Sequence, residues 1–244
     1  MSRFYVPKES IRGNVITIRG QEARHIIDVM RLKKLDKVVT FDGTGREYSG
    51  FIKDIKPRLV TVEVIQSRTP SGRETSRITL VQAIPKKDKM DYIVEKATEL
   101  GVHSIIPVVT RRTIPDWDES KRSSHVQRWR KLATEASKQC GRADIPQVED
   151  IRPFSDCLEG LGDYDLALIA ALDDAAVNLK EAIADFMGGK IIVAIGPEGD
   201  FAPDEVGQAR KAGFRLVSLG SRVLKSDTAG LAVMAILNYE FSDR

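Results

Sequence analysis

The chain has 244 residues, of which 42% are hydrophobic and 30% are charged, and this balance predicts a soluble globular protein of one large domain or two modest ones. No run of 18 apolar residues occurs and the N-terminal residues lack an apolar signal core, so neither a membrane span nor a secretion signal is expected. Cys140 and Cys157 form no CxxC pair, which argues against a disulfide framework or a zinc site and favours a reducing cytoplasm.

Charge is distributed unevenly along the chain, although the formal net charge is only +3. Residues 1–77 hold 16 Lys and Arg against 9 Asp and Glu (net +7), residues 78–142 hold 13 against 8 (net +5), and residues 143–244 hold 9 against 18 (net −9). A basic front part indicates a polyanionic partner such as RNA. The alternative is an ordinary solvated charged surface.

The first 65 or so residues predict a small β-rich domain, because short strands at this spacing are typical of a small barrel or meander. The predicted strands are residues 15–18, 37–41, 48–55 and 59–65, and a helix is predicted over residues 22–31. The polar residues 66–76, which include Pro70 and Gly72 and show no periodicity, predict an interdomain linker.

From Arg77 onward strands and helices alternate, which predicts a mostly parallel sheet covered by helices on both faces. The predicted strands are residues 78–84, 102–109, 165–171, 190–195 and 214–219, and the predicted helices are residues 89–100, 123–139, 177–187, 202–212 and 227–241. The last helix is apolar on all sides, so it must be buried in the core or in a subunit interface.

Two predicted strands end in loops of small residues. Gly196-Pro197-Glu198-Gly199 follows one strand, and Leu219-Gly220 begins the loop after the next. Ligands of α/β folds bind at the carboxyl ends of strands, so the two loops predict one shared pocket; a plain strand-to-helix turn is the alternative for the first. The spacing matches neither the dinucleotide fingerprint nor a P-loop. His25, His103 and His125 lack metal-ligand spacing, so no metal site is expected.

The helix predicted over residues 123–139 carries two stripes. The apolar stripe contains Trp129, Leu132, Ala133, Ala136 and Cys140, and the mostly basic stripe beside it contains Arg128, Lys131, Glu135, Lys138 and Arg142. Together with Arg111 and Arg112 just upstream, the basic stripe favours contact with RNA phosphates. An ordinary solvated helix face remains the alternative.

Several motifs along the chain occur together in one known family. They are Arg3-Phe4-Tyr5-Val6 and residues 25–31, 41–45, 86–91, 96–102, 135–142, 196–199 and 219–229. In this order they resemble the RsmE family of SPOUT methyltransferases, which methylate N-3 of a uridine in 16S ribosomal RNA.

The resemblance implies an α/β fold class with two domains. Residues 1–70 would form a PUA-like RNA-binding β-barrel, and residues 77–244 a SPOUT methyltransferase domain with a parallel sheet and a C-terminal trefoil knot, a rare kind of threading. The cofactor would be S-adenosylmethionine, and the partners would be 16S rRNA or the small ribosomal subunit and a second copy of the chain. We therefore expect a cytoplasmic enzyme of rRNA processing and ribosome biogenesis, with no membrane and no metal.

The resemblance also implies which residues form the cofactor site, and we add hypotheses for the catalytic and RNA-binding residues. The cofactor site would contain Leu172, Gly196, Pro197, Glu198, Gly199, Leu219, Gly220, Arg222, Val223 and Leu224. As catalytic residues, Arg222 would stabilise charge on a uracil oxygen, and Glu198 would either fix its loop or take a proton. RNA phosphates would be contacted by Arg3, Arg24, Arg31, Arg111, Arg112, Arg128 and Arg142.

The chain departs from the family pattern at Asp200, where a second Gly is usual, and at Ala202, where a Ser or Thr usually caps the next helix. The run Lys225-Ser226-Asp227-Thr228 replaces the usual Arg-Thr-Glu-Thr. Two other functions are compatible with these motifs. One is a SPOUT enzyme that methylates a ribose 2′-hydroxyl or another base atom, and the other is a non-catalytic RNA-binding protein of ribosome assembly.

Overall fold

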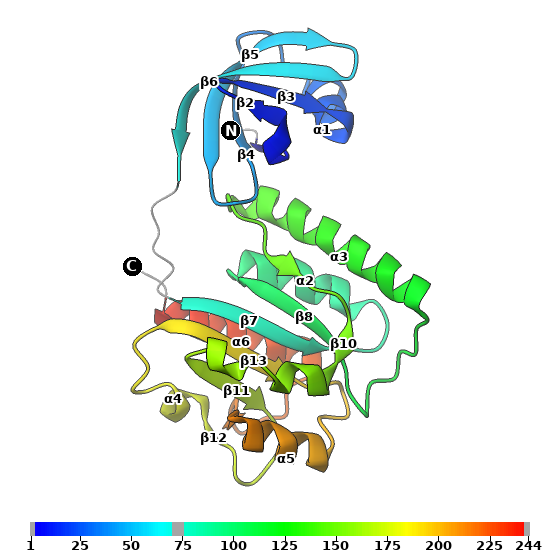
Figure 1. The fold of residues 1–244 in the computed structure, drawn as a ribbon, viewed down its shortest axis with the longest axis vertical. Helices are drawn as coiled ribbons and strands as arrows, with labels where there is room; N and C mark the ends of the chain where they lie inside the picture. The colour runs from blue at the N-terminus through cyan, green and yellow to red at the C-terminus, as the bar shows by residue number, and fades with distance from the viewer. Residues whose placement is uncertain (1–2, 70–75, 242–244) are drawn as a thin grey trace. The chain divides into compact units, whose positions relative to one another are not determined.

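The computed structural model describes residues 3–69 and 76–241, and the contacts divide the chain into two units. Unit 1 comprises residues 1–71 and 137–145, and unit 2 comprises residues 72–136 and 146–244 (Figure 1). Most of the predicted linker, residues 70–75, lies outside the described residues.

Unit 1 is built on a six-stranded sheet in the order β1-β4-β5-β6-β3-β2. Its strands are β1 (Arg3–Tyr5), β2 (Ile11–Arg12), β3 (Val15–Arg19), β4 (Lys37–Phe41), β5 (Glu47–Lys56) and β6 (Leu59–Arg68). All pairs are antiparallel except β1 with β4. The apolar residues of alternate strand positions, such as Ile16, Ile18, Val60 and Val62, form its core.

The helical segment of unit 1 packs on this sheet through Ala23 and Ile26. It begins as α1 (Gly20–Arg24) and continues as a π-helical turn at His25–Val29, in place of the single helix predicted. A short 3₁₀ helix at Lys8–Ser10 precedes β2.

Unit 1 also contains residues 137–145, although sequence patterns placed them in the C-terminal domain. Gly43 and Thr44 form β-bridges with Asp144, and the Ile145 amide donates to the Gly43 carbonyl oxygen at 3.1 Å. Lys138 Nζ donates to Glu22 Oε1 at 2.7 Å. These long-range contacts tie the end of helix α3 (Glu119–Cys140) to the core of unit 1.

Unit 2 contains the predicted parallel sheet. Its strands lie in the order β10-β8-β7-β13-β11-β14-β12, with β9 beside β8. They are β7 (Ser76–Ala83), β8 (Ser104–Val109), β9 (Gln147–Val148), β10 (Arg152–Pro153), β11 (Leu166–Ala170), β12 (Val177–Asn178), β13 (Gly189–Ile195) and β14 (Arg215–Ser218). The helices are α2 (Lys89–Glu99), α3, α4 (Leu179–Ala182), α5 (Pro203–Ala212) and α6 (Ser226–Phe241), with 3₁₀ turns at Phe154–Leu158 and Leu161–Asp163.

Both faces of this sheet are covered, which explains the near-continuous apolar runs of its strands. In β7, Val81 and Ala83 join a core cluster with Val206 of α5. Gln82, on the opposite face, hydrogen-bonds Ser226 of α6. Helix α6 packs on α2 and β7, so the chain leaving β14 returns past β11 and β13 (Figure 1).

The helix predicted over residues 177–187 is wrong in its extent. Val177 and Asn178 pair with β14 as strand β12, and helix α4 then spans only four residues. The Asn178 side chain accepts from the Lys180 amide at 2.9 Å and so caps the N-terminus of α4. The prediction had placed Asn178 inside the helix. Among the described residues, no helix is long and apolar enough to cross a membrane.

Candidate cofactor pocket and RNA-binding residues

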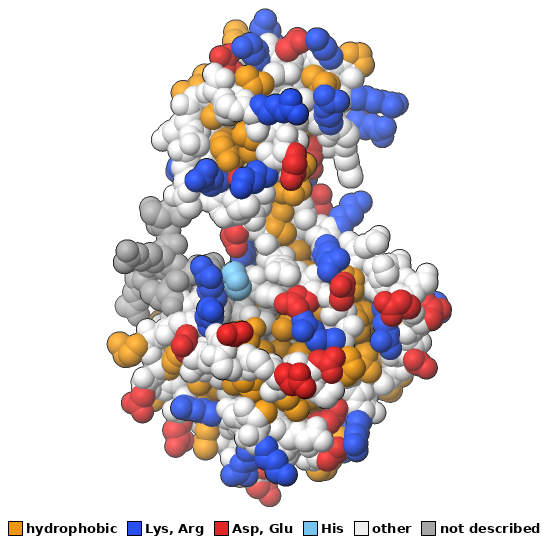
Figure 2. Space-filling view, viewed as in Figure 1, with side chains coloured by type: hydrophobic (Ala, Val, Ile, Leu, Met, Phe, Trp, Pro, Cys, Tyr) orange, Lys and Arg blue, Asp and Glu red, His pale blue; other side chains and the backbone are white. Residues whose placement is uncertain are grey.

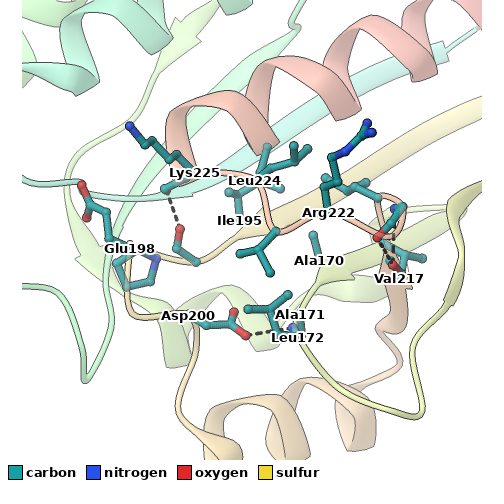
Figure 3. A pocket seen from close by; sticks show the side chains of 18 residues that line it. Ala170, Ala171, Leu172, Ile195, Glu198, Asp200, Val217, Arg222, Leu224 and Lys225 are labelled. Carbon is teal, nitrogen blue, oxygen red and sulfur yellow. Dashed lines mark hydrogen bonds between the residues drawn. The ribbon is translucent and has the colours of Figure 1, made fainter.

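A pocket opens at the carboxyl edge of the unit 2 sheet, between the loops that follow β11, β13 and β14 (Figure 3). Three neighbouring strands form the floor of the pocket. Ala170 of β11 pairs with Ile195 of β13 and with Val217 of β14, so the three strands end at nearly the same level. The lining consists of Ala170, Ala171, Leu172, Ile195, Gly196, Pro197, Glu198, Asp200, Val217, Ser218, Leu219, Gly220, Arg222, Val223, Leu224, Lys225, Ser226 and Ala229.

The pocket brings together the residues predicted for the cofactor site, apart from Gly199. The Gly199 carbonyl oxygen instead accepts from Arg112 Nη1 at 2.6 Å. Ala170, Ile195 and Val217 were missed by the sequence prediction. Ala170 and Ile195 are the last residues of their strands and Val217 is the last but one of β14. Parallel pairing places them side by side, and this pairing cannot be predicted from one strand alone.

Buried hydrogen bonds fix the first loop. Ser226 Oγ donates to the Gly196 carbonyl oxygen at 2.5 Å and accepts from Gln82 Nε2 at 3.0 Å. Gln82 and Ser226 are both buried, so this chain of bonds is shielded from competing water. It joins the loop after β13 to β7 and to the first turn of α6.

Asp200 joins the same loop to the one after β11. Its backbone φ is +61°, in the left-handed region that glycine and, less readily, Asp and Asn adopt, which explains the Gly usual at this position. Its carboxylate accepts from the Leu172 amide at 2.8 Å and from the Phe201 amide at 2.8 Å. Figure 3 shows the Asp200 side chain directed at Leu172 across the pocket edge.

The Glu198 side chain points away from the pocket centre in Figure 3. It accepts from the Lys86 amide at 3.2 Å and from Lys89 Nζ at 3.2 Å. Burial by itself raises the pKa of Glu198, but hydrogen bonds from backbone amides and from Lys89 outweigh it and hold the pKa below the ordinary value. These contacts favour a loop-fixing role over proton transfer.

The Arg222 side chain is exposed and is directed away from the apolar floor in Figure 3. Its guanidinium has no hydrogen bond or ion pair within residues 3–69 and 76–241. Arg222 therefore lines the pocket with a charge that is available to a substrate at the mouth.

Glu205 compensates for the missing hydroxyl at Ala202. Its carboxylate accepts from the Ala202 amide at 2.9 Å and from the Arg111 amide at 3.0 Å. The N-terminus of α5 is thus capped by a side chain of its own first turn.

The lining suits the nucleoside part of S-adenosylmethionine. Alanine, valine and isoleucine side chains form an apolar floor, and Gly220, with a φ of +119° and open space where a Cβ would lie, brings its backbone to the pocket wall. Leu172 and Val223 are 67% and 74% exposed. A bound ring system would cover such apolar surface. In the described part of the chain, no group of three His, Cys, Asp or Glu is arranged to hold a metal ion.

The seven arginines predicted to contact RNA differ in availability. Arg24 and Arg31 are exposed on unit 1, where Figure 2 shows several Lys and Arg side chains. Arg111 and Arg128 are exposed, although each pairs with a carboxylate, Asp204 and Asp91 respectively.

Arg3 and Arg142 are largely buried. Arg3 pairs with Glu47 and donates to the Arg142 carbonyl oxygen at 2.9 Å, and Arg142 pairs with Asp144. These contacts favour a structural role for both residues in unit 1.

The chain thus combines a β-sheet unit with a parallel α/β unit whose pocket lies at the strand ends, where α/β folds bind their ligands. A family described as RNA methyltransferase domain matches residues 73–238, and one described as RNA methyltransferase PUA domain matches residues 18–65. The chain belongs to the RNA methyltransferase family, and the fold class predicted from its motifs is confirmed.

Relatives over nearly the whole chain carry one name, "Ribosomal RNA small subunit methyltransferase E". The protein from Bacillus subtilis is 27% identical, with 98% of this chain and 97% of the relative covered. The protein from Rickettsia conorii is 30% identical, with 96% and 93% covered. The solved structure of the Neisseria gonorrhoeae protein bound to S-adenosyl methionine has 29% identity and a TM-score of 0.87, with 100% and 99% covered.

Proposed function

We propose that this protein methylates N-3 of a uridine in the 16S RNA of the small ribosomal subunit, with S-adenosylmethionine as cofactor. The observation that carries the proposal is the pocket whose floor is Ala170, Ile195 and Val217 at the level ends of three parallel strands. The full-length similarity to small-subunit rRNA methyltransferases supports the same substrate. Such a function belongs to rRNA processing and ribosome biogenesis in the cytoplasm.

The cofactor supplies an electrophilic methyl group when bound. The chain must hold the uracil ring against it and stabilise the negative charge that develops as the imide proton leaves. Arg222 and Lys225 are exposed cations of the lining without a side-chain partner among the described residues. We assign Arg222, whose planar guanidinium carries several donors, to a uracil oxygen. Glu198, held by Lys86 and Lys89, keeps the loop after β13 in place.

Replacing Arg222 by Ala should lower the rate of methylation about 100-fold, the usual effect of removing one charge-stabilising donor. Binding of S-adenosylmethionine should change less than threefold, because the apolar floor and the Ser226 bonds remain. Single-turnover methylation of small ribosomal subunits and calorimetric titration of the cofactor measure the two quantities. Arg210→Ala, on the exposed side of α5, is the matched control. Unchanged turnover in Arg222→Ala would contradict the assignment.

The position of the methyl group decides between the proposal and its nearest alternative. After reaction with labelled cofactor, nuclease digestion and mass spectrometry of 16S RNA should yield N-3-methyluridine. A labelled ribose 2′-hydroxyl or another base atom would indicate a different SPOUT activity. Binding of RNA without binding of cofactor would indicate a non-catalytic assembly protein.

We assign the RNA contacts to the exposed arginines Arg24, Arg31, Arg111, Arg112 and Arg128. Phosphate contacts of this kind give affinity that falls steeply with salt and little choice of sequence. The predicted division into an RNA-binding domain over residues 1–70 and a methyltransferase domain over residues 77–244 remains part of this proposal. RNA shape must then select the uridine, which has to leave its stack to reach the pocket.

We further propose that the protein is a homodimer through the exposed face of α6. Ile236 and Tyr239 are exposed on this face, and a groove lined by Leu179, Ile183, Leu219 and Ile236 lies beside it. Exposed apolar side chains beside an apolar-lined groove are typical of an interface, and the sequence predicted that this helix is buried in the core or in a subunit interface. Because Leu219 lines both groove and cofactor pocket, dimerisation would border the site.

Ile236→Asp should convert the dimer to a monomer at micromolar concentration, because an unpaired carboxylate would be buried in the interface. Light scattering after size-exclusion chromatography measures the mass. Gln208→Asp, which adds the same charge to an exposed position of α5, should leave the dimer intact. A wild-type monomer, or a dimeric Ile236→Asp variant, would contradict the assignment.

A further inference from the structure

Two carboxylates line the cofactor pocket, and they differ in their electrostatic surroundings. Glu198 is neutralised by Lys89, which lies 3.2 Å from it. Asp200 accepts hydrogen bonds only from the backbone amides of Leu172 and Phe201, and no cationic side chain pairs with it within the described chain. Asp200 therefore places a carboxylate at the pocket wall without a cationic side chain bonded to it.

The geometry holds this charge in place. The Asp200 carboxylate spans from its own loop to Leu172, and a Cβ added at Gly196 would lie 3.1 Å from Asp200 Oδ1. The side chain is thus confined on two sides by backbone of the pocket. A fixed charge acts on a ligand without the cost of reorienting when the ligand binds.

The ligand's own charge changes in the reaction that the proposed function assigns to the pocket. S-adenosylmethionine carries a positive sulfonium, whereas S-adenosylhomocysteine, which remains after the methyl group and its bond to sulfur are lost, carries a neutral thioether. A carboxylate at the wall lowers the cost of moving the sulfonium out of water and does nothing for the thioether.

We propose that Asp200 is a specificity-determining residue that makes the pocket prefer the methylated cofactor to its demethylated product. This inference rests on the proposed function. It assigns to Asp200 two tasks, holding the Leu172 loop against the loop after β13 and selecting the cationic ligand. Methyl transfer removes the positive charge of the cofactor, so S-adenosylhomocysteine would bind the pocket more weakly and be released more readily.

The test compares wild type with Asp200→Asn by calorimetric titration of three ligands at low salt. They are S-adenosylmethionine, S-adenosylhomocysteine, and sinefungin, an analogue with an amine in place of the sulfonium methyl. Asn tolerates the left-handed backbone and keeps one side-chain acceptor for the Leu172 amide, but its amide nitrogen cannot accept from the Phe201 amide. Because that lost hydrogen bond is the same for every ligand, the ratio of affinities is the quantity that reports the charge. Affinity for the two cationic ligands should fall about fivefold to tenfold, while affinity for S-adenosylhomocysteine stays within twofold.

Two further variants separate charge from structure. Asp173→Asn removes a carboxylate from the loop after β11 that does not line the pocket, and it should leave all three affinities unchanged. Asp200→Gly is compatible with the φ of +61°, but it removes both the charge and the hydrogen bond to the Leu172 amide. All three ligands should therefore bind more weakly, and the affinity for S-adenosylmethionine relative to S-adenosylhomocysteine should fall as much as in Asp200→Asn.

Each other outcome overturns the inference. An equal loss for all three ligands in Asp200→Asn would place the carboxylate at a group they share, such as the α-ammonium or a ribose hydroxyl. An unchanged ratio in both Asp200 variants would leave Asp200 a purely structural residue. Failure of wild type to bind S-adenosylmethionine would overturn the proposed function itself, and this result differs from the other two.

Discussion

Gly196→Trp should abolish saturable binding of S-adenosylmethionine, with affinity reduced at least 100-fold. Even a Cβ at this position would lie 3.1 Å from the Phe201 amide nitrogen and 3.1 Å from the Phe201 ring, both held by the start of α5. The loop must therefore move, and it would break the 2.5 Å bond from Ser226 and distort the pocket wall. Calorimetric titration of the cofactor measures the loss.

Gly207→Ala provides the matched control, since a Cβ there meets nothing within 4 Å. It should retain cofactor binding and stabilise the protein by about 0.5–1 kcal/mol, because Ala is the better helix residue inside α5. Gly196→Ala should show a smaller loss than Gly196→Trp. Normal cofactor affinity in a folded Gly196→Trp protein would show that the pocket lies elsewhere.

Glu47→Gln should destabilise unit 1 by about 3 kcal/mol, the lower end of the usual effect of removing one partner of a buried ion pair. The Glu47 side chain is 3% exposed and pairs with Arg3 and, at 2.9 Å, with Arg68. Removing its charge would leave the Arg3 guanidinium, which also lies over the Phe41 ring, without a counter-ion. Urea denaturation measures the change in the free energy of unfolding.

The pH dependence of this effect has a definite sign. Burial raises the pKa of Glu47, but hydrogen bonds and charges from Arg3 and Arg68 outweigh it, so the pKa in the folded state lies below the ordinary 4.5. The stabilisation is therefore complete above about pH 4.5 and is lost as pH falls through the folded-state pKa. The difference between wild type and Glu47→Gln should shrink over that acidic range.

Glu63→Gln is the control for this prediction, because its pair with Lys53 is exposed and 3.5 Å long. Such surface pairs contribute less than about 1 kcal/mol. If Glu63→Gln lowered the free energy of unfolding as much as Glu47→Gln does, the effect would come from losing any charge in this sheet and not from the buried ion pair.

Features that depend on local pattern were predictable from the sequence. The apolar runs that end in Gly196 and Leu219-Gly220 identify strands and loops, because β-branched residues and glycine have strong local preferences. The predicted strands at residues 190–195 and 214–219 correspond to β13 and β14, and the loops after them line one pocket. That the pocket binds the cofactor through these residues stays a prediction.

Features that depend on distant partners were not predictable. Arg3 looks like a free cation in the sequence, but its partner Glu47 is 44 residues away and its other acceptor, at Arg142, is 139 residues away. Val177 and Asn178 looked helical until pairing with Val217 and Ser218 drew them into the sheet. The predicted helix 177–187 therefore begins two residues late, as α4 at Leu179, since a tertiary contact overrides a weak local preference.

The inclusion of residues 137–145 in unit 1 has a consequence for the order of events during synthesis. The ribosome releases the N-terminal strands first, yet the bridges of Gly43 and Thr44 to Asp144 cannot form until about a hundred further residues have emerged. Unit 1 therefore cannot be completed before residue 145 has been translated, and by then residues 72–136 of unit 2 have already emerged. A fragment that ends at residue 70 should fold into a sheet that is frayed at this end, and faster amide exchange at Gly45 would report it, because the Gly45 amide donates to the Ala143 carbonyl oxygen at 3.1 Å.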